Sequence, residues 1–326
     1  MLQDAFGRIH TYLRISLTEK CNLRCFYCMP ADYNTFTPPA QLMQLKEIES
    51  IARTFVHLGI TKIRLTGGEP LVRKDAGDII SMLSAMPVEL TISTNGIRLH
   101  EFLPQLQMAN IKSVNISLDT LQEDKFLFIT KQNKFKDVLQ NIILMTQHNI
   151  HVKINVVVMS SVNDHEINDF IEWTKHLLVH VRFIEFMPFS GNSWDNKKVI
   201  GWQQILQTIE SKYSFIKLKD DLHDTAKKYM VPGHAGTFAV ISTITAPFCS
   251  SCNRLRLTAD GKMKNCLFST SETDLLSALR NGENLIPLIQ QSVLSKAAER
   301  GGQFNENIEL IDAAGMQNRT MIAIGG

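Results

Sequence analysis

The feature that most constrains this chain is a regular alternation of short β-branched runs with longer segments of helical periodicity. Strands are predicted at residues 11–17, 61–67, 89–94, 112–119, 151–159 and 181–187. Between them, apolar residues recur at three- and four-residue spacing over 45–58, 75–86, 100–108, 135–148 and 164–178, which predicts amphipathic helices. Helical crossovers imply parallel strands, and the six units carry no strong glycine-rich dinucleotide motif. We therefore predict an α/β fold, with residues 1–200 forming an incomplete (βα)6 barrel of the TIM type.

The pattern changes after residue 200. A helix is predicted over 202–212, followed by a polar stretch and by short strands near 237–244, 255–258 and 262–266. The dipeptide Asp260-Gly261 between the last two runs predicts a hairpin, and helices are expected near 272–281 and 285–300. We expect residues 201–326 to form a second, C-terminal region that completes the mouth of the barrel.

The composition excludes several other classes of protein. Of the 326 residues, 44% are hydrophobic and 20% are charged, which is typical of a folded globular protein and not of a disordered, collagen-like or coiled-coil chain. No apolar run approaches the roughly 18–20 residues of a membrane span, and the N-terminal segment lacks the apolar core of a signal peptide. The net charge of +2 does not favour a nucleic-acid partner. These observations predict a cytoplasmic protein that binds neither a membrane nor nucleic acid.

The cysteines form two tight groups. The groups are Cys21, Cys25 and Cys28, and Cys249, Cys252 and Cys266. Disulfides are disfavoured because a reducing cytosol keeps thiols reduced, and because two groups of three do not pair internally without a remainder. Thiolates at such spacings are metal ligands. Three thiolates can hold three irons of a [4Fe–4S] cluster and leave the fourth iron open, whereas structural zinc sites normally take four protein ligands.

The first cysteine group lies in a run, CNLRCFYC, that resembles the signature of the radical S-adenosylmethionine (SAM) superfamily. The run TGGEP, residues 66–70 at the end of the second predicted strand, resembles the superfamily's glycine-rich segment that receives the methionine amino group of SAM. The resemblance implies a first [4Fe–4S] cluster on this cysteine group, with SAM bound by Tyr27, Gly68, Ser117 and Met187. By sequence alone, TGGEP is also consistent with a plain strand-to-helix connection.

The second cysteine group, in the run PFCSSCNRLRLTADGKMKNC, narrows the resemblance to the GTP 3′,8-cyclase family of molybdenum cofactor biosynthesis. The similarity extends over essentially the whole chain, from LRISLTEKCNLRCFYCMP through RFIEFMP to the terminal MIAIGG. In that family a second three-cysteine [4Fe–4S] cluster binds the guanine of GTP. Spacing alone does not separate this role from that of an auxiliary structural or electron-transfer cluster, or from a three-cysteine zinc site.

Recognition of a triphosphate requires several cations, because its negative charge must be neutralised in a desolvated pocket. Alternate residues of a strand share one face, so Arg254 and Arg256 are expected to lie together beside the second cysteine group. The resemblance implies a GTP site formed by Arg14, Arg64, Ser93, Lys153, Arg254 and Arg256. Ser93 stands where relatives often have threonine and keeps the hydroxyl. Taken singly, each strand arginine is equally consistent with a solvated or ion-paired residue.

The resemblance also implies the reaction and its partners. The catalytic residues would be Arg14, Arg182 and a double-glycine tail, Gly325-Gly326, that reaches into the cavity. The enzyme would be a lyase that converts GTP to (8S)-3′,8-cyclo-7,8-dihydroguanosine 5′-triphosphate, with two [4Fe–4S] clusters and SAM as cofactors. Partners would be a reductant such as flavodoxin or ferredoxin, a cyclic pyranopterin monophosphate synthase that takes the product, and a second copy in a homodimer. The alternatives are a peptide-modifying radical SAM maturase and, from another class, a ferredoxin-like carrier or zinc-binding module.

Overall fold

The computed structural model describes residues 1–29, 33, 36–303, 311, 316 and 318–325. Its strands are β1 (Leu2–Gln3), β2 (Ile9–His10), β3 (Tyr12–Ser16), β4 (Lys62–Thr66), β5 (Glu89–Thr94), β6 (Ser113–Ser117), β7 (His151–Val158), β8 (Val179–Glu185), β9 (Ile216–Lys217), β10 (Lys227–Met230), β11 (Thr237–Ile241), β12 (Arg254–Leu257), β13 (Lys262–Lys264) and β14 (Thr273–Asp274). Its α-helices are α1 (Leu45–His57), α2 (Ala76–Ser84), α3 (Leu99–Met108), α4 (Glu123–Thr130), α5 (Phe135–Gln147), α6 (Ile167–Trp173), α7 (Trp202–Glu210), α8 (Leu275–Arg280), α9 (Leu285–Leu294) and α10 (Met321–Ile324). Short 3-10 helices are η1 (Pro39–Gln41), η2 (Pro70–Val72), η3 (Asp164–Glu166), η4 (Asn196–Lys198), η5 (Cys249–Ser251) and η6 (Arg300–Gly302).

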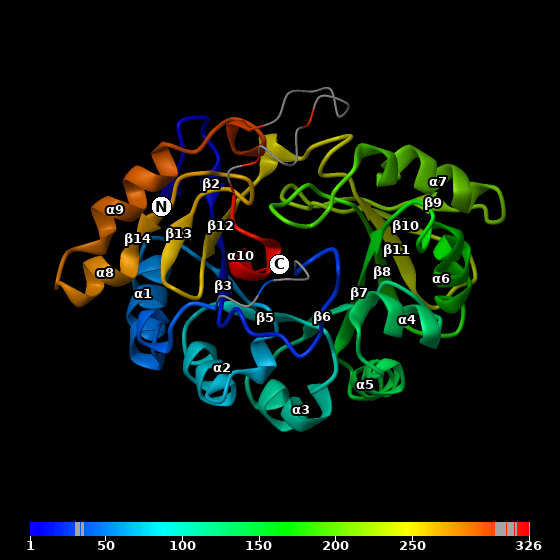
Figure 1. Cartoon of the computed structure of the whole chain (residues 1–326), viewed down its shortest axis with the longest axis horizontal. Helices are drawn as coiled ribbons and strands as arrows, with labels where there is room; N and C mark the ends of the chain where they lie inside the picture. The colour runs from blue at the N-terminus through cyan, green and yellow to red at the C-terminus, as the bar shows by residue number, and fades with distance from the viewer. Residues whose placement is uncertain (30–32, 34–35, 304–310, 312–315, 317, 326) are drawn as a thin grey trace.

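A curved sheet of twelve strands carries the fold, with helices on its outer side (Figure 1). The strand order is β14-β13-β12-β3-β4-β5-β6-β7-β8-β11-β10-β9. All neighbours from β12 through β11 in this order are parallel, and the outermost pairs at both ends are antiparallel. The two end strands, β14 and β9, do not pair with each other within the described residues. The prediction of an incomplete (βα)6 barrel is therefore confirmed.

The βα units follow the predicted periodicity. On α1, the buried residues Ile48, Ile51, Ala52 and Phe55 fall at helical spacing and pack against the sheet, as an amphipathic crossover helix requires. The six predicted strands correspond to β3 through β8, each displaced by at most a few residues. One helix, α4, was not predicted, because the segment 123–130 is short and its apolar residues do not form a clear stripe.

The C-terminal residues extend the same sheet at both edges. Strand β11 pairs in parallel with β8, and β12 pairs in parallel with β3, so residues after 200 flank the six predicted strands. The predicted hairpin at Asp260-Gly261 joins β12 to β13, and Gly261 has a φ of 69° there, a value that glycine adopts without strain. The prediction of a helix as far as residue 300 is wrong after Leu294. The chain leaves the helix there. In the segment that follows, the Lys296 ammonium contacts the sulfur of Cys252, and the Arg300 amide contacts the sulfur of Cys249.

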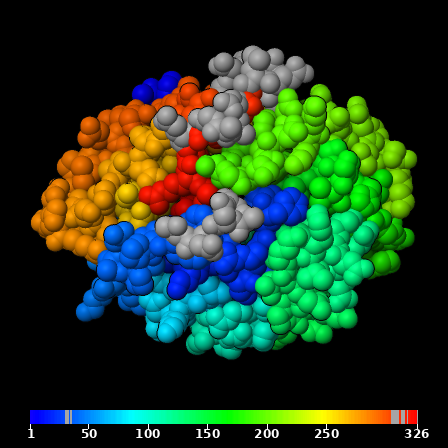
Figure 2. Space-filling view, in the orientation of Figure 1, coloured from blue at the N-terminus to red at the C-terminus, as the bar shows by residue number. Residues whose placement is uncertain are grey.

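The C-terminal helix α10 lies inside the curve of the sheet (Figure 1). Its Ile324 packs in a small apolar cluster with Phe189, Ile244 and Phe268. The space-filling view shows this C-terminal segment between the yellow and orange part of the chain and the green part (Figure 2). The tail therefore closes one side of the barrel interior. In the described ranges, no helix combines the length and the apolar character needed to cross a membrane.

Candidate active site

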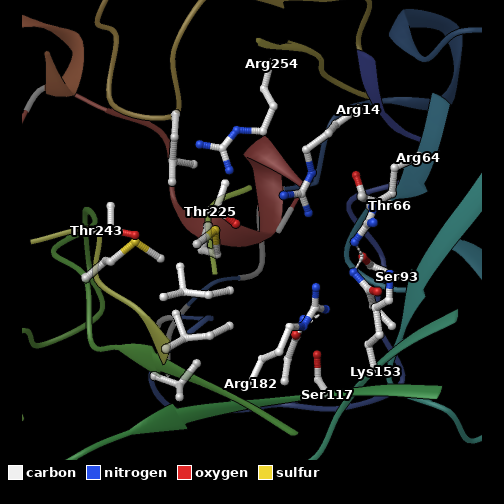
Figure 3. Close-up of a pocket in the computed structure, with 18 of the residues that line it drawn as sticks. Arg14, Arg64, Thr66, Ser93, Ser117, Lys153, Arg182, Thr225, Thr243 and Arg254 are labelled. Atoms are coloured by element: carbon white, nitrogen blue, oxygen red, sulfur yellow. Dashed lines mark hydrogen bonds between the residues drawn. The ribbon is translucent and has the colours of Figure 1, made fainter. Parts of the chain in front are cut away.

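A cavity of about 710 Å³ runs along the inner face of the sheet. Its lining begins at Tyr12 and Lys62, at the starts of β3 and β4, and continues to the loops beyond the carboxyl ends of these strands. All six cysteines line this one cavity. Two groups separated by more than two hundred residues in the sequence thus face the same space. Cationic side chains, among them Arg14, Arg182 and Arg254, line it as well (Figure 3).

The first cysteine group lies on the loop after β3, and hydrogen bonds hold this loop on two sides. The amide of Leu23 donates to Sγ of Cys21 over 3.4 Å. The amide of Arg24 donates to the carbonyl of Thr130, at the end of α4, over 2.9 Å. The helix that sequence periodicity missed therefore fixes the path of the cysteine loop.

The thiols of this group are suited to a cationic metal partner. Burial raises the pKa of Cys21 to about 11, and the nearby carboxylate of Glu69 adds to the rise. Burial likewise raises the pKa of Cys28 to about 12, with Cys21 as the next contributor. Such thiols keep their protons until a metal displaces them. With all three cysteines free and lining one wall, the donor set fits a [4Fe–4S] cluster.

The second cysteine group has the opposite electrostatic environment. Burial acts to raise the pKa of Cys252, but the charges of Arg254 and Lys296 outweigh it and lower the pKa to about 6. Both cations contact Sγ of Cys252 over 3.7 Å, and the amide of Arg300 donates to Sγ of Cys249 over 3.5 Å. Donor groups aimed at sulfur are the outer contacts expected of cluster ligands, so this group also fits an iron–sulfur cluster.

The positions of the cysteines also bear on the alternative of a zinc site. In the part of the chain that the structure describes, no three Cys, His, Asp or Glu side chains converge on one point as the ligands of a single ion would.

The two glycines of TGGEP lie very close to the backbone of another segment, the one that leads into the first cysteine group. A Cβ on Gly67 would lie 2.6 Å from the carbonyl oxygen of Thr18, and one on Gly68 would lie 2.6 Å from that of Lys20. The amide of Gly68 donates to Thr18 over 2.7 Å. Glycine is therefore required here to dock the segment that leads into the first cysteine group.

The acidic residue of this run, Glu69, is buried and ties two strand ends together. Its carboxylate accepts hydrogen bonds at the end of β5, from Oγ1 of Thr94 over 2.8 Å and from the amide of Asn95 over 2.6 Å. Burial raises the pKa of Glu69 to about 7 despite these bonds. Glu69 therefore links the turn after β4 to the end of β5.

Three of the predicted arginines form a row across adjacent strands. Arg256 on β12 is in register with Arg14 on β3, and Arg14 is in register with Arg64 on β4. Burial, followed by the charge of Arg256, lowers the pKa of Arg14, which shows how unfavourable this cluster of like charges is. An anion in the cavity would relieve the repulsion, which is the electrostatic signature of a polyphosphate site.

Lys153 and Arg182 extend the positive lining on β7 and β8 (Figure 3). Burial, and next the charge of Arg182, lowers the pKa of Lys153 to about 8. The Nε atoms of Arg64 and Arg182 are buried and make no hydrogen bond within the described part of the chain. Unsatisfied donors of this kind are rare in folded proteins and mark a place where a ligand supplies the acceptors.

The residues predicted to bind SAM and GTP all line this cavity. They are Tyr27, Gly68, Ser117 and Met187 for SAM, and Arg14, Arg64, Ser93, Lys153, Arg254 and Arg256 for GTP. The hydroxyl of Tyr27 donates to Asp119 over 2.6 Å, so this ring is held from the end of β6. Their individual roles stay predictions, but their convergence in space is a property of the structure.

The tail approaches the same residues. The carbonyl of Gly325 accepts a hydrogen bond from Nη1 of Arg256 over 2.7 Å. Gly325 has a φ of 84°, and a Cβ there would lie 2.7 Å from Oγ1 of Thr66 and 2.8 Å from Cβ of Ser16. Only glycine fits this position without displacing the strand ends. The other predicted tail residue, Gly326, lies outside the described residues.

Several lining residues escaped the sequence reasoning. They are Tyr12, Lys62, Asn115, Asp119 and Asn155. A signal for four of them was available, because Tyr12, Lys62, Asn115 and Asn155 each lie two positions from a predicted residue on the same strand and therefore share its face. Asn155 accepts a hydrogen bond from Nη2 of Arg182, which orients that guanidinium in the cavity.

Comparison with known proteins first defines the class. A family model described as "Radical SAM superfamily" matches residues 15–174, and one described as "Molybdenum Cofactor Synthesis C" matches residues 179–301. A structure of Streptococcus suis SuiB bound to S-adenosylmethionine shares the fold with a TM-score of 0.63 at 13% identity, covering 83% of this chain and 65% of that one. A structure of anSMEcpe with bound AdoMet gives a TM-score of 0.51 at 16% identity, covering 62% and 57%. The fold is that of the radical SAM superfamily, and together with the family match it confirms the predicted class of enzyme and its use of SAM and iron–sulfur chemistry.

Curated relatives define the family. The chain is 45% identical over its whole length to "GTP 3',8-cyclase, mitochondrial" of Arabidopsis thaliana, of which it covers 84%. It is 40% identical to "GTP 3',8-cyclase" of Peptoclostridium acidaminophilum, covering 98% of that protein. It is 46% identical to "Molybdenum cofactor biosynthesis protein 1" of Mus musculus but spans only 51% of that longer protein. The chain belongs to the GTP 3′,8-cyclase family, as its motifs predicted.

Proposed function

We propose that this enzyme converts GTP to (8S)-3′,8-cyclo-7,8-dihydroguanosine 5′-triphosphate. The observation that carries the proposal is that both cysteine groups and the row of arginines line one cavity. Ligands in that cavity can contact a metal centre on either cysteine group and the cations that line the same space. GTP has a base that can coordinate iron and a triphosphate that requires cations.

The groups that the cysteines would hold supply the radical chemistry. Cys21, Cys25 and Cys28 would hold the first [4Fe–4S] cluster, which together with SAM would supply the radical chemistry for hydrogen abstraction at ribose C3′. Cys249, Cys252 and Cys266 would carry the second cluster, beside which the guanine would lie.

The protein's own residues would bind and orient the substrate. Phosphate charge would be neutralised by Arg256, Arg14 and Arg64. The nucleotide would also be contacted from β7 and β8, by Lys153 and Arg182. Fixing GTP at both ends limits its internal rotation, so that ribose C3′ and guanine C8 stay within bonding reach. The C-terminal segment would exclude water, with Gly325 held by Arg256 and the terminal glycine beyond it.

The proposal includes partners that follow from the reaction. A reductant such as flavodoxin or ferredoxin would supply electrons, and a cyclic pyranopterin monophosphate synthase would take the product. A homodimer and a cytoplasmic location are part of the same proposal. Six cysteines used as metal ligands suit a reducing compartment.

The reaction can be tested by following the hydrogen at C3′. The anaerobically reconstituted protein is incubated with SAM, reductant and GTP deuterated at C3′. We expect 5′-deoxyadenosine that has gained one mass unit, together with a chromatographically distinct isomer of GTP. ATP and a ribosomally made peptide serve as alternative substrates. Unlabelled 5′-deoxyadenosine with GTP recovered unchanged would refute the proposal, and modification of the peptide would favour the maturase alternative.

A further inference from the structure

The N-terminal segment contacts the second cysteine group, which is far from it in the sequence. The guanidinium of Arg8 donates to the carbonyl of Cys249 over 2.9 Å, to that of Ala298 over 2.6 Å and to that of Ala297 over 2.9 Å. Arg8 is itself fixed by Asp4, whose carboxylate accepts its Nε–H over 2.6 Å. Both side chains are buried, with 7% of Arg8 and none of Asp4 exposed. This pair therefore joins the loop that carries Cys249 to the segment that follows α9.

That segment carries a buried lysine. Lys296 is 4% exposed, and its ammonium donates to the carbonyl of Arg254 over 3.0 Å and to Sγ of Cys252 over 3.7 Å. Lys296 belongs to none of the ion pairs found between the described residues, whereas the buried cations Arg8 and Lys264 each pair with a carboxylate. A buried ammonium is stable only with a compensating charge. Cys252, whose sulfur lies 3.7 Å from the ammonium, would supply that charge as a cluster ligand.

We propose that Lys296 is a positioning residue of the second cluster, held against Cys252 by the Asp4–Arg8 pair. The inference rests on the proposed function, because it requires a cluster on the second cysteine group. Its role is to donate to one cluster ligand and to place a fixed positive charge beside the cluster. Hydrogen bonds to sulfur and local charge are the means by which a protein sets the potential and retention of such a centre.

The clusters on the two cysteine groups would then differ in reduction potential, because the charges around them differ. The first has carboxylates nearby, including Glu69 beside Cys21, whereas the second has Lys296 and Arg254 on Cys252. Positive charge stabilises the more reduced cluster. The second cluster is therefore expected to have the higher potential of the two and to be reduced before the first.

The test uses full-length protein in which Cys21, Cys25 and Cys28 are alanine, so that only the second cluster is present. Lys296→Gln removes the charge and keeps a donor for the carbonyl of Arg254, and Lys296→Arg restores the charge. Arg280→Gln is the control for loss of one positive charge, because Arg280 also donates to a backbone carbonyl, that of Ala40, but pairs with Glu47 and touches neither cysteine group. The measurements are a redox titration followed by electron paramagnetic resonance, and the rate of iron loss to a chelator.

Lys296→Gln is expected to lower the midpoint potential and to speed iron loss by roughly tenfold to a hundredfold, the effect of one charge-assisted hydrogen bond. Lys296→Arg should recover most of both, and Arg280→Gln should change neither. An unchanged potential and iron-loss rate in Lys296→Gln, with the cluster present, would overturn this inference alone. Failure of the protein with Lys296 intact to hold any cluster would overturn the proposed function, and this inference with it.

Discussion

Replacing Lys153 by methionine should stabilise the ligand-free protein while weakening its binding of GTP. The side chain lies on β7 in the cavity, beside the positive charges of Arg182 and Arg64. Burial, followed by these charges, lowers the pKa of Lys153 from 10.5 to about 8. The folded protein therefore holds the ammonium at a cost in free energy, which a neutral side chain of similar length removes.

The size of the effect follows from that shift. The fall of the pKa from 10.5 to about 8, at about 1.4 kcal/mol per pKa unit, sets an upper limit of about 3.5 kcal/mol. Because the side chain faces a cavity open to water, we reduce this to about 1–2 kcal/mol. In a chain of this size that should raise the melting temperature by about 2–5 °C. Losing a charge-assisted contact to a phosphate, worth about 1.5–3 kcal/mol, should weaken GTP binding roughly tenfold to a hundredfold.

The same group predicts a pH dependence. Since the folded pKa is about 8 and the unfolded value is 10.5, the unfolded chain binds more protons between these values. The destabilisation by Lys153 is complete below pH 8 and disappears as the pH rises towards 10.5. GTP should raise this pKa again, so binding near pH 8.5 should take up protons.

Three measurements check this reasoning. Anaerobic calorimetry without nucleotide gives the melting temperature, equilibrium dialysis gives the GTP affinity, and titration calorimetry in buffers of different ionisation enthalpy gives proton uptake. Lys46→Met, on the exposed face of α1, is the control and should change none of them. A Lys153→Met protein that melts at a lower temperature and binds GTP with unchanged affinity and proton uptake would refute the argument.

Four further predictions follow from particular contacts. Cys21→Ala should abolish formation of 5′-deoxyadenosine, whereas Cys266→Ala should retain some uncoupled formation while losing the cyclised product; equal loss of both activities in the two folded proteins would contradict separate roles. Gly325→Ala should lower cyclised product at least tenfold with iron content unchanged, because the new Cβ would lie 2.7 Å from Thr66 Oγ1; product assays and iron analysis decide, and wild-type turnover would show that the tail is dispensable. Glu185→Gln should lower the free energy of unfolding by about 2–4 kcal/mol in urea titrations, because this fully buried carboxylate accepts from Trp202 N and Ile244 N and an amide cannot accept on both sides.

Much of the fold was predictable because its units are local. The period of α1 and the alternation along β7 are properties of short windows, in which side-chain spacing alone reports which face is buried. The first cysteine group was predictable for the same reason, since its three thiols lie within eight residues of one another. The helix α4 was missed for the opposite reason. Its last residues are hydrogen-bonded to the cysteine loop, which is far away in the sequence, and a short sequence window does not include such a contact.

The site itself depends on juxtapositions that only the tertiary structure decides. Arg256 and Arg14 are far apart in the sequence and become neighbours because β12 adds to the edge of the sheet beside β3. The contact of Arg8 with Ala297 and Ala298 spans nearly the whole chain and has no local signal. Sequence alone determined the types of side chain available and the strands and helices that carry them. Register, edge pairing and chain reversal decided which charges and thiols share one cavity, since these depend on the free energy of packing the whole sheet and not on any one segment.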